Sequence, residues 1–194
     1  MDRLWSPWRL PYILNGGEAR GCVFCEAFAD SDPPEPTAAD AGTFHQSSLI
    51  VFRGTTCYVI LNLYPYNNGH LMVVPNRHIA SLAAATGDEL SELIELTRRS
   101  EVALVEAYSP HGMNMGINLG KSAGAGVLDH VHMHIVPRWS GDTNFMTVVG
   151  ETRVLPEELT RTAEKLKPIF QKLARHEDDP VAQTGETAET RLKK

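Results

Sequence analysis

The stretch that decides the fold reads Asp129-His130-Val131-His132-Met133-His134-Ile135-Val136-Pro137-Arg138, in which histidine and a hydrophobic residue alternate three times. Neighbouring side chains on a β-strand point to opposite faces, so this alternation predicts a strand over residues 131–136. We expect the three imidazoles on one face of that strand and the hydrophobic side chains on the other, in the core. Solvated strand faces usually contain threonine, lysine and glutamate as well, so the histidine row indicates chemistry.

Imidazole side chains in a row suit a reaction at phosphorus. A neutral ring nitrogen is a competent nucleophile near neutral pH when the other ring nitrogen is held as a donor. The glycine-rich residues 118–126 lead directly into the histidine row, and their backbone N–H groups can form a nest for an anion. Two neighbouring histidines could instead converge on one metal ion, but three in a row do so less readily. The combination predicts a phosphate-handling site.

The rest of the chain predicts an α+β domain with an antiparallel sheet of about five strands. Strands are expected over residues 48–53, 57–62, 71–74, 113–119 and 131–136. Hydrophobic residues at three- and four-residue steps predict a long helix over residues 88–108, capped by Thr86 or Gly87. A C-terminal helix is expected from Pro156 to Leu173. One catalytic domain therefore covers residues 1–174, with an exposed loop over 28–43 and a disordered tail over 175–194.

Length and charge exclude several classes of protein. The 194 residues carry a net charge of −6, whereas a dedicated nucleic-acid binder would be strongly basic. A phosphate partner must therefore be held by local groups. We find no apolar run long enough to span a membrane and no secretory signal, which predicts a cytoplasmic protein with no membrane partner. No organic cofactor is expected.

The cysteines do not form a disulfide scaffold, but two of them are spaced as metal ligands. Cys22 and Cys25 have the spacing of a zinc knuckle, which supplies only half of a site, so the other ligands would be histidines distant in sequence. A redox pair is less well supported, because it would need a strand-to-helix junction in a βαβ unit. Two reduced buried thiols are the remaining alternative. Cys57 lies within a predicted strand and is read as a core residue.

With these motifs the sequence resembles the histidine-triad (HIT) proteins. The family motif, His-φ-His-φ-His-φ-φ with φ hydrophobic, matches residues 130–136 in full. Residues 67–78, Asn-Asn-Gly-His-Leu-Met-Val-Val-Pro-Asn-Arg-His, resemble the family's Gly-His-apolar-Pro-basic-His segment. Residues 22–25 resemble its N-terminal Cys-x-x-Cys. The resemblance implies a HIT-like sheet and self-association into a homodimer or a higher homo-oligomer.

The resemblance also implies roles for single residues in a nucleotidyl transfer. His132 corresponds to the nucleophile that attacks an α-phosphate, and His134 to the histidine that contacts the phosphate and assists the leaving group. The residues expected to bind the nucleotide or its phosphates are Asn62, Asn118, Gly120, Lys121, Ser122, Gly124 and Trp139. Similarity to zinc-bearing members of the superfamily implies that His70 and His130 complete a structural zinc site with Cys22 and Cys25.

Departures from the family pattern bear on the substrate. Many HIT hydrolases have glutamine followed by serine or threonine where this chain has Gly126 and Val127. Together with Trp139, this is similar to the branch that acts on diadenosine tetraphosphate, which includes phosphorylases that use inorganic phosphate and release ADP and ATP. A hydrolase of dinucleoside polyphosphates or adenosine phosphoramidates is the alternative. A nucleotide-sensing module and a protein whose histidines all bind metal are two further hypotheses.

Overall fold

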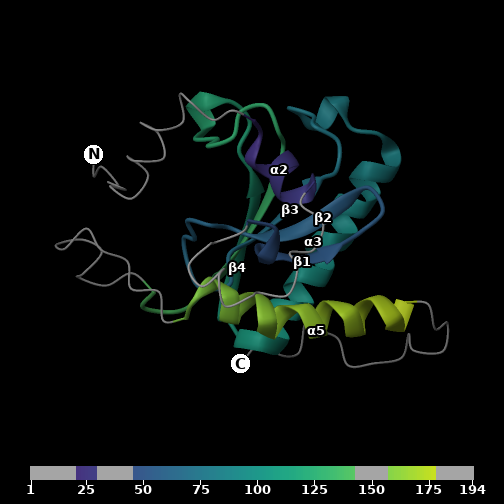
Figure 1. Ribbon diagram of the computed structural model, residues 1–194. Coiled ribbons are helices and arrows are strands. Elements are labelled where there is room, and N and C mark those ends of the chain that lie inside the picture. Colours follow the sequence, from purple (N-terminus) through teal and green to yellow (C-terminus); the bar gives the residue numbers. More distant parts are fainter. Residues whose placement is uncertain (1–20, 30–45, 143–156, 178–194) are drawn as a thin grey trace, which may run out of the picture.

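The computed structural model describes residues 21–29, 46–142 and 157–177 (Figure 1). At its centre is a five-stranded sheet with the order β1-β2-β3-β5-β4, in which all neighbouring strands are antiparallel. The strands are β1 (Ile50–Arg53), β2 (Cys57–Leu61), β3 (Leu71–Pro75), β4 (Gly112–Ile117) and β5 (Met133–Arg138). The predicted α+β class and antiparallel sheet are confirmed.

Three α-helices accompany the sheet in the described residues: α2 (Val23–Ala29), α3 (Gly87–Tyr108) and α5 (Leu159–Glu177). Short 3₁₀ turns are η1 (Gln46–Leu49), η2 (Leu82–Ala84) and η3 (Lys121–Ala123). The long helix α3 packs on β2, β3 and β5, and α5 packs on α3 and β1. Figure 1 shows α5 along the lower side of the molecule and α2, in purple, near the upper ends of the strands. No helix in the described ranges is long and apolar enough to cross a membrane.

The start of α3 is encoded locally. The Thr86 hydroxyl accepts a hydrogen bond from the Glu89 backbone N–H at 3.2 Å, and the Glu89 carboxylate accepts one from the Thr86 N–H at 2.7 Å. This reciprocal capping box satisfies two N–H groups that an open helix end would leave unpaired. The helix ends at Tyr108, and the residue that caps it, Ser109, has a φ of 45°, in the left-handed region. The helix predicted over residues 88–108 is therefore confirmed to within one residue.

The two faces of the sheet have different neighbours. The Cys57 thiol contacts the Glu89 carbonyl oxygen of α3 at 3.6 Å, whereas the hydroxyl of the next residue, Tyr58, donates to the Phe24 carbonyl of α2 at 2.8 Å. Because strand residues alternate in direction, α3 and α2 lie on opposite faces. Met72 of β3 pairs with Ile60 on one side and with His134 on the other. His134 therefore faces the side of the sheet on which α2 lies.

Several predicted boundaries need correction. β1 begins at Ile50, because residues 48 and 49 belong to η1, and β4 covers Gly112–Ile117 where residues 113–119 were expected. α5 begins at Leu159, three residues after the expected start.

β5 begins at Met133 and not at residue 131, because the Val131 N–H bonds to the Ile79 carbonyl, beyond the end of β3, at 2.7 Å. His130 and His132 therefore precede the strand. α5 continues to Glu177, past the expected domain end at 174, and α2 includes residues 28 and 29 of the expected loop. Residues 30–43 and 178–194, which make up the rest of the predicted loop and tail, lie outside the described residues.

Candidate active site

A cavity of about 280 Å³ lies between α2, the face of the sheet on which α2 lies, and the loop that contains Gly124. Much of its wall is hydrophobic and comes from Val23, Phe24, Leu49, Ile60, Met72 and Val127. Its polar groups come from Asn62, Tyr64, Tyr66, His132 and His134. An apolar chamber with a few converging polar groups is the usual form of a small-molecule site.

His132 is held in one tautomer. Its Nδ1 lies 2.9 Å from the backbone carbonyl oxygen of His130, which can only accept, so Nδ1 carries the hydrogen. In the neutral ring, Nε2 then keeps its lone pair. The side chain is 4% exposed, and burial lowers the pKa of His132, which favours the neutral form. His132 is thus a buried imidazole whose Nε2 lone pair is available to act as a nucleophile.

A second histidine pair sets the tautomer of His134. The Tyr66 backbone N–H donates to Nδ1 of His70 at 3.1 Å, so the hydrogen of the neutral His70 ring is on Nε2. Nε2 of His70 lies 3.0 Å from Nδ1 of His134 and donates to it. The hydrogen of His134 is then on Nε2, the donor that this residue can present to a ligand in the cavity. The His132 and His134 ring centroids are 4.7 Å apart, so acceptor and donor lie side by side.

The expected metal ligand His70 is not at the cysteines. Its Nδ1 and Nε2 are engaged by Tyr66 and His134, and its ring stacks on Tyr66 with centroids 4.9 Å apart. The structure instead brings His78 to the cysteines. The potential ligand atoms of Cys22, Cys25, His78 and His130 all lie within 4.8 Å of one another. The expected cysteines and His130 are therefore brought together, and His78 stands where His70 was predicted.

These four side chains fit a tetrahedral metal ion. Nδ1 of His130 lies 3.3 Å from the Cys22 sulfur and 3.6 Å from the Cys25 sulfur, and Nδ1 of His78 lies 3.3 Å from the Cys25 sulfur. Zinc bonds of about 2.3 Å to sulfur and about 2.0 Å to nitrogen give a sulfur–nitrogen edge of about 3.5 Å in a tetrahedron. Nε2 of His130 donates to the Pro75 carbonyl at 2.9 Å, which leaves Nδ1 as the ligand atom.

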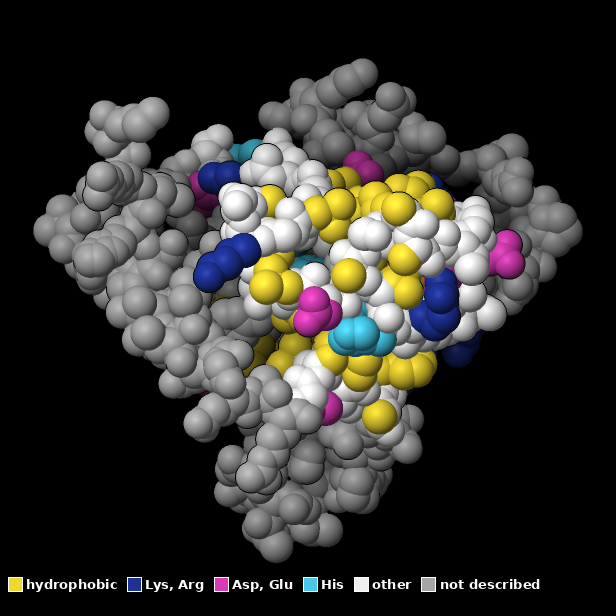
Figure 2. Space-filling model, turned by 90° about the horizontal axis from the view of Figure 1, so that it is seen from above, with side chains coloured by type: hydrophobic (Ala, Val, Ile, Leu, Met, Phe, Trp, Pro, Cys, Tyr) yellow, Lys and Arg dark blue, Asp and Glu magenta, His cyan; other side chains and the backbone are white. Residues whose placement is uncertain are grey.

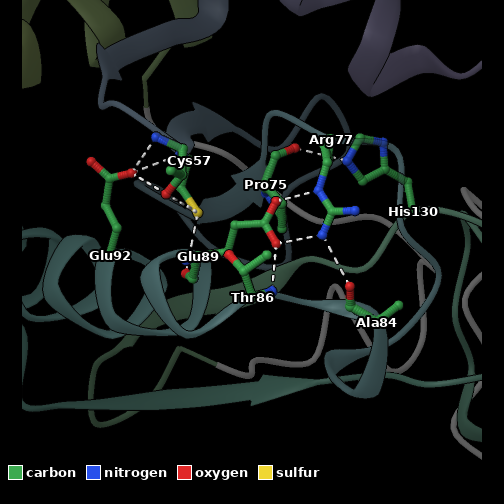
Figure 3. A network of polar contacts seen from close by, with 9 residues as sticks. Cys57, Pro75, Arg77, Ala84, Thr86, Glu89, Glu92 and His130 are labelled. Carbon is green, nitrogen blue, oxygen red and sulfur yellow. Dashed lines mark hydrogen bonds and ion pairs between the residues drawn. The ribbon is translucent and has the colours of Figure 1, made fainter.

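An ion pair between the exposed Arg77 side chain and the buried carboxylate of Glu89 anchors the segment that carries His78 (Figure 3). The Arg77 guanidinium makes two hydrogen bonds of 2.7 Å to the Glu89 carboxylate and a third, of 3.0 Å, to the Ala84 carbonyl. Arg77 thereby holds the pKa of Glu89 at about 2. Because Pro75 binds His130 and Arg77 binds α3, the chain between them is fixed at both ends, and His78 follows directly.

Only part of the predicted nucleotide-binding set lines the cavity. Asn62 does so, and its side-chain oxygen accepts the Tyr64 backbone N–H at 2.9 Å. Gly124 also lines it, with a φ of 85° that glycine adopts without strain. Four others, Asn118, Gly120, Lys121 and Ser122, lie in the preceding part of the same loop and are not among the lining residues.

Trp139 is placed at the opposite end of β5 from His132. It directly follows the strand, whereas His132 directly precedes it, and its backbone N–H donates to Asp142 at 3.3 Å. Among the described residues it is not part of the cavity wall. The structure therefore does not bring Trp139 to the two histidines within one chain.

Figure 2 shows how charged side chains are distributed over one face of the molecule. The face in Figure 2 carries histidine side chains among hydrophobic ones, and the lysines and arginines of its described part are scattered. The described part of this face therefore shows no concentration of basic side chains at one place.

Sequence reasoning assigned no role to Phe24, Tyr66 or His78. Phe24 lies inside the Cys-x-x-Cys motif, which could have suggested that it packs beside the four potential metal ligands, called the metal group below. Tyr66 acts through its backbone N–H, for which a sequence carries no signal. His78 was visible only as the second histidine of the segment over residues 67–78.

Comparison with known proteins identifies the family. The HIT domain family model matches residues 43–141. The AP-4-A phosphorylase of Mycobacterium tuberculosis is 39% identical over 162 residues, which cover 84% of this chain and 80% of that protein. The asymmetrical bis(5'-nucleosyl)-tetraphosphatase of Schizosaccharomyces pombe is 33% identical over 99 residues, covering 51% of this chain and 54% of that protein.

A solved structure shows the same fold. The crystal structure of a zinc-bound histidine triad family protein from Mycobacterium smegmatis superposes with a TM-score of 0.59 at 23% identity, covering 80% of this chain and 96% of that one. The fold, the complete motif with its paired imidazoles and the sequence matches agree. The chain belongs to the HIT family.

Proposed function

We propose that this protein cleaves diadenosine tetraphosphate by phosphorolysis, through an adenylyl group carried on His132. The observation that carries the proposal is the hydrogen bond from Nδ1 of His132 to the His130 carbonyl, which leaves Nε2 as a nucleophile in the cavity. The name of the M. tuberculosis relative, at 39% identity, supports diadenosine tetraphosphate as the substrate and phosphate as the acceptor.

The first step breaks a bond between the α-phosphorus and a bridging oxygen. The Nε2 lone pair of His132 attacks the α-phosphorus, and ATP departs with the bridging oxygen. The Nε2–H of His134 donates to that oxygen or to a neighbouring phosphate oxygen, which stabilises the charge that develops there. Since His70 fixes Nδ1 of His134 as the acceptor, the donor is already in place before the substrate binds.

The second step discharges the enzyme. An oxygen of inorganic phosphate attacks the adenylyl phosphorus, the phosphorus–nitrogen bond to His132 breaks, and ADP is released. The two steps together convert diadenosine tetraphosphate and phosphate into ATP and ADP. Lys121 and Ser122, in the loop that leads to the cavity, are the predicted residues nearest in sequence to Gly124 that can bind the incoming phosphate.

The size of the cavity agrees with one half of the substrate. Ligand cavities usually measure about 300–1,000 Å³, and at about 280 Å³ this one suits a single nucleotide. The hydrophobic wall would hold the adenine and Asn62 the ribose hydroxyls. The remaining phosphates and the second adenosine would then leave the cavity past His134.

Zinc at Cys22, Cys25, His78 and His130 has a structural role in this proposal. All four positions of the tetrahedron would come from the protein, so a bound zinc ion would have no open position for substrate. It would supply a cross-link between α2 and the segment before β5, and no catalytic step depends on it. Self-association into a homodimer or higher oligomer stays a prediction from the family resemblance.

A hydrolase is the second candidate. It is favoured by the S. pombe relative, which is named as a tetraphosphatase. Water in place of phosphate would attack the same adenylyl group on His132 and release AMP. The two functions therefore share the first step and differ only in the acceptor.

Product analysis distinguishes the candidates. Diadenosine tetraphosphate is incubated with the protein with and without inorganic phosphate, and nucleotides are separated by ion-exchange chromatography. We expect equal amounts of ADP and ATP and a rate that requires phosphate. AMP and ATP, formed at a rate that does not depend on phosphate, would establish the hydrolase. His132→Ala should abolish turnover, while His111→Ala, at an exposed histidine bonded to Ser140, should retain it.

A further inference from the structure

We infer that metal binding at Cys22, Cys25, His78 and His130 is thermodynamically coupled to nucleotide binding in the cavity, because α2 contacts both sites and His130 joins the metal group to His132. The inference rests on the proposed nucleotide site, but it holds whichever acceptor the enzyme uses. It assigns Phe24 as a positioning residue for His132.

The first link is the helix α2. Cys22 directly precedes α2 and Cys25 lies in its first turn, and their sulfur atoms contact the imidazoles of His130 and His78. Val23 and Phe24, between those cysteines, line the cavity. The same turn of helix thus contributes to the metal group and to the wall of the nucleotide cavity. A shift of this turn therefore changes the geometry of both sites.

The second link is His130 itself. Its Nδ1 belongs to the metal group, whereas its backbone carbonyl accepts the hydrogen bond from Nδ1 of His132. His130 is 1% exposed, so its side chain and backbone have little freedom to move separately. Fixing the imidazole on a metal ion therefore also fixes the carbonyl that orients His132.

The third link is the Phe24 ring. Its centroid lies 5.5 Å from that of His130, edge to face, and 4.8 Å from that of His132. The ring is 4% exposed and lies in contact with both imidazoles. A ring packed in this way restricts the rotation of His132 about its side-chain bonds. Phe24 touches the nucleophile but makes no bond to reacting atoms, so its role is positioning.

The metal group holds the N-terminal turn of α2, to which the sheet contributes one further contact, the hydrogen bond from the Tyr58 hydroxyl to the Phe24 carbonyl. A helix of seven residues is too short to be stable alone. Towards its C-terminus, Phe28 stacks on Tyr58, and its carbonyl accepts a hydrogen bond from Arg53. The N-terminal turn is the part that the cysteines fasten to His78 and His130. Metal binding is therefore expected to reduce the motion of the turn that carries Phe24.

Coupling between two sites is reciprocal, which makes the inference testable without an activity assay. If the metal strengthens nucleotide binding by some factor, the nucleotide must strengthen metal binding by the same factor. Coupling between sites in proteins typically amounts to about 5- to 150-fold. Since three contiguous links join these two sites, we expect a factor of at least about 5 in each direction.

The experiment uses zinc(II) and AMP as the two probes on the full chain. The dissociation constant of AMP is measured by calorimetry for the zinc-loaded and the chelator-treated protein. The dissociation constant of zinc is measured by competition with a chromophoric chelator, with and without saturating AMP. We expect zinc to tighten AMP binding and AMP to tighten zinc binding by the same factor. Phe24→Leu should bind one zinc ion per chain but show a smaller factor.

Phe28→Leu is the matched control, because it removes a ring from the same helix that stacks on Tyr58 and not on His132. It should keep the full coupling factor. If the chelator-treated protein unfolds, the zinc competition with and without AMP decides alone, since it starts from loaded protein. A zinc affinity that AMP leaves unchanged, or a loaded protein that does not bind AMP, overturns the inference. Coupling without cleavage of diadenosine tetraphosphate would refute the proposed function and leave the coupling intact.

Discussion

Replacing His70 by alanine separates the roles that the sequence and the structure assign to this residue. The side chain is fully buried and accepts the Tyr66 N–H and donates to His134. The truncation leaves these half-buried groups of Tyr66 and His134 without their hydrogen bond and also removes the contact between His70 and the Asn62 amide nitrogen. Losing the partner of a buried polar group costs about 1–3 kcal/mol. We therefore expect the free energy of unfolding to fall by about 2–6 kcal/mol. His70→Gln, whose amide can still donate to His134, should lose less.

The effect on catalysis should be specific to kcat. Without the donor from His70, His134 is no longer held with its hydrogen on Nε2, so the donor for the departing oxygen is present only part of the time. General acid catalysis is worth about 10²–10⁴-fold, and we expect kcat to fall by at least about 10-fold with a smaller change in KM. Steady-state kinetics on folded His70→Ala and His70→Gln measure this difference, with His70→Gln the more active of the two.

Zinc content tests whether His78 or His70 is the fourth metal ligand. His70 is hydrogen-bonded to Tyr66 and His134 and does not belong to the metal group, so its variants should retain zinc. His78 does belong to that group, so His78→Gln should lose affinity for zinc. Equilibrium dialysis followed by elemental analysis gives the zinc bound per chain. If the His70 variants lose zinc and His78→Gln keeps it, the ligand set described above is wrong and the one predicted from the sequence is right.

Two further predictions concern stability. Glu92 of α3 accepts hydrogen bonds from the backbone N–H groups of residues 55–57, where β1 turns into β2. Glu92→Gln should therefore lower the free energy of unfolding, measured in urea, by about 1–3 kcal/mol. An unchanged free energy of unfolding would contradict this role. The pKa of Glu89 is about 2, against an ordinary value of 4.5, so its stabilisation is complete above about pH 4.5 and is lost as the pH falls towards 2. Wild type should therefore lose more stability than Glu89→Gln between about pH 5 and pH 3, and equal losses in urea unfolding would argue against this carboxylate.

Local signals explain why much of the fold was predictable. The Thr86–Glu89 capping box and the hydrophobic steps of α3 are contained in neighbouring residues, as is the alternation around His134. The same alternation continues through His130, yet the ladder begins only at Met133. Pairing with β3 runs from Leu71 to Val73, and the residues before it bond to the chain beyond β3 instead. A pattern in one strand cannot show how far its pairing with the neighbouring strand extends.

The site was predictable in its chemistry but not in its partners. The histidine motif and the cysteine spacing singled out His132, His134 and the two cysteines, and the structure places the histidines at the cavity and the cysteines beside His130. His70 and His78 flank β3 at opposite ends, and which of them meets the cysteines depends on which end of the strand α2 packs against. That is a tertiary contact between segments 53 residues apart, as the Cys25–His78 pair shows. Trp139 directly follows the strand that contains His134, at the far end from the cavity, so its predicted role in binding the nucleotide stays a prediction.

The central claim is that Nε2 of His132 becomes adenylylated, and trapping that adduct tests it most directly. The protein is mixed with diadenosine tetraphosphate in phosphate-free buffer, quenched in alkali, which preserves a phosphorus–nitrogen bond, and mapped by peptide mass spectrometry. We predict one adenylyl group per chain on the peptide that contains His132, its absence from His132→Ala, and its conversion to ADP when phosphate is added. Cleavage of the substrate with no adduct, or with an adduct on another residue, would contradict the account.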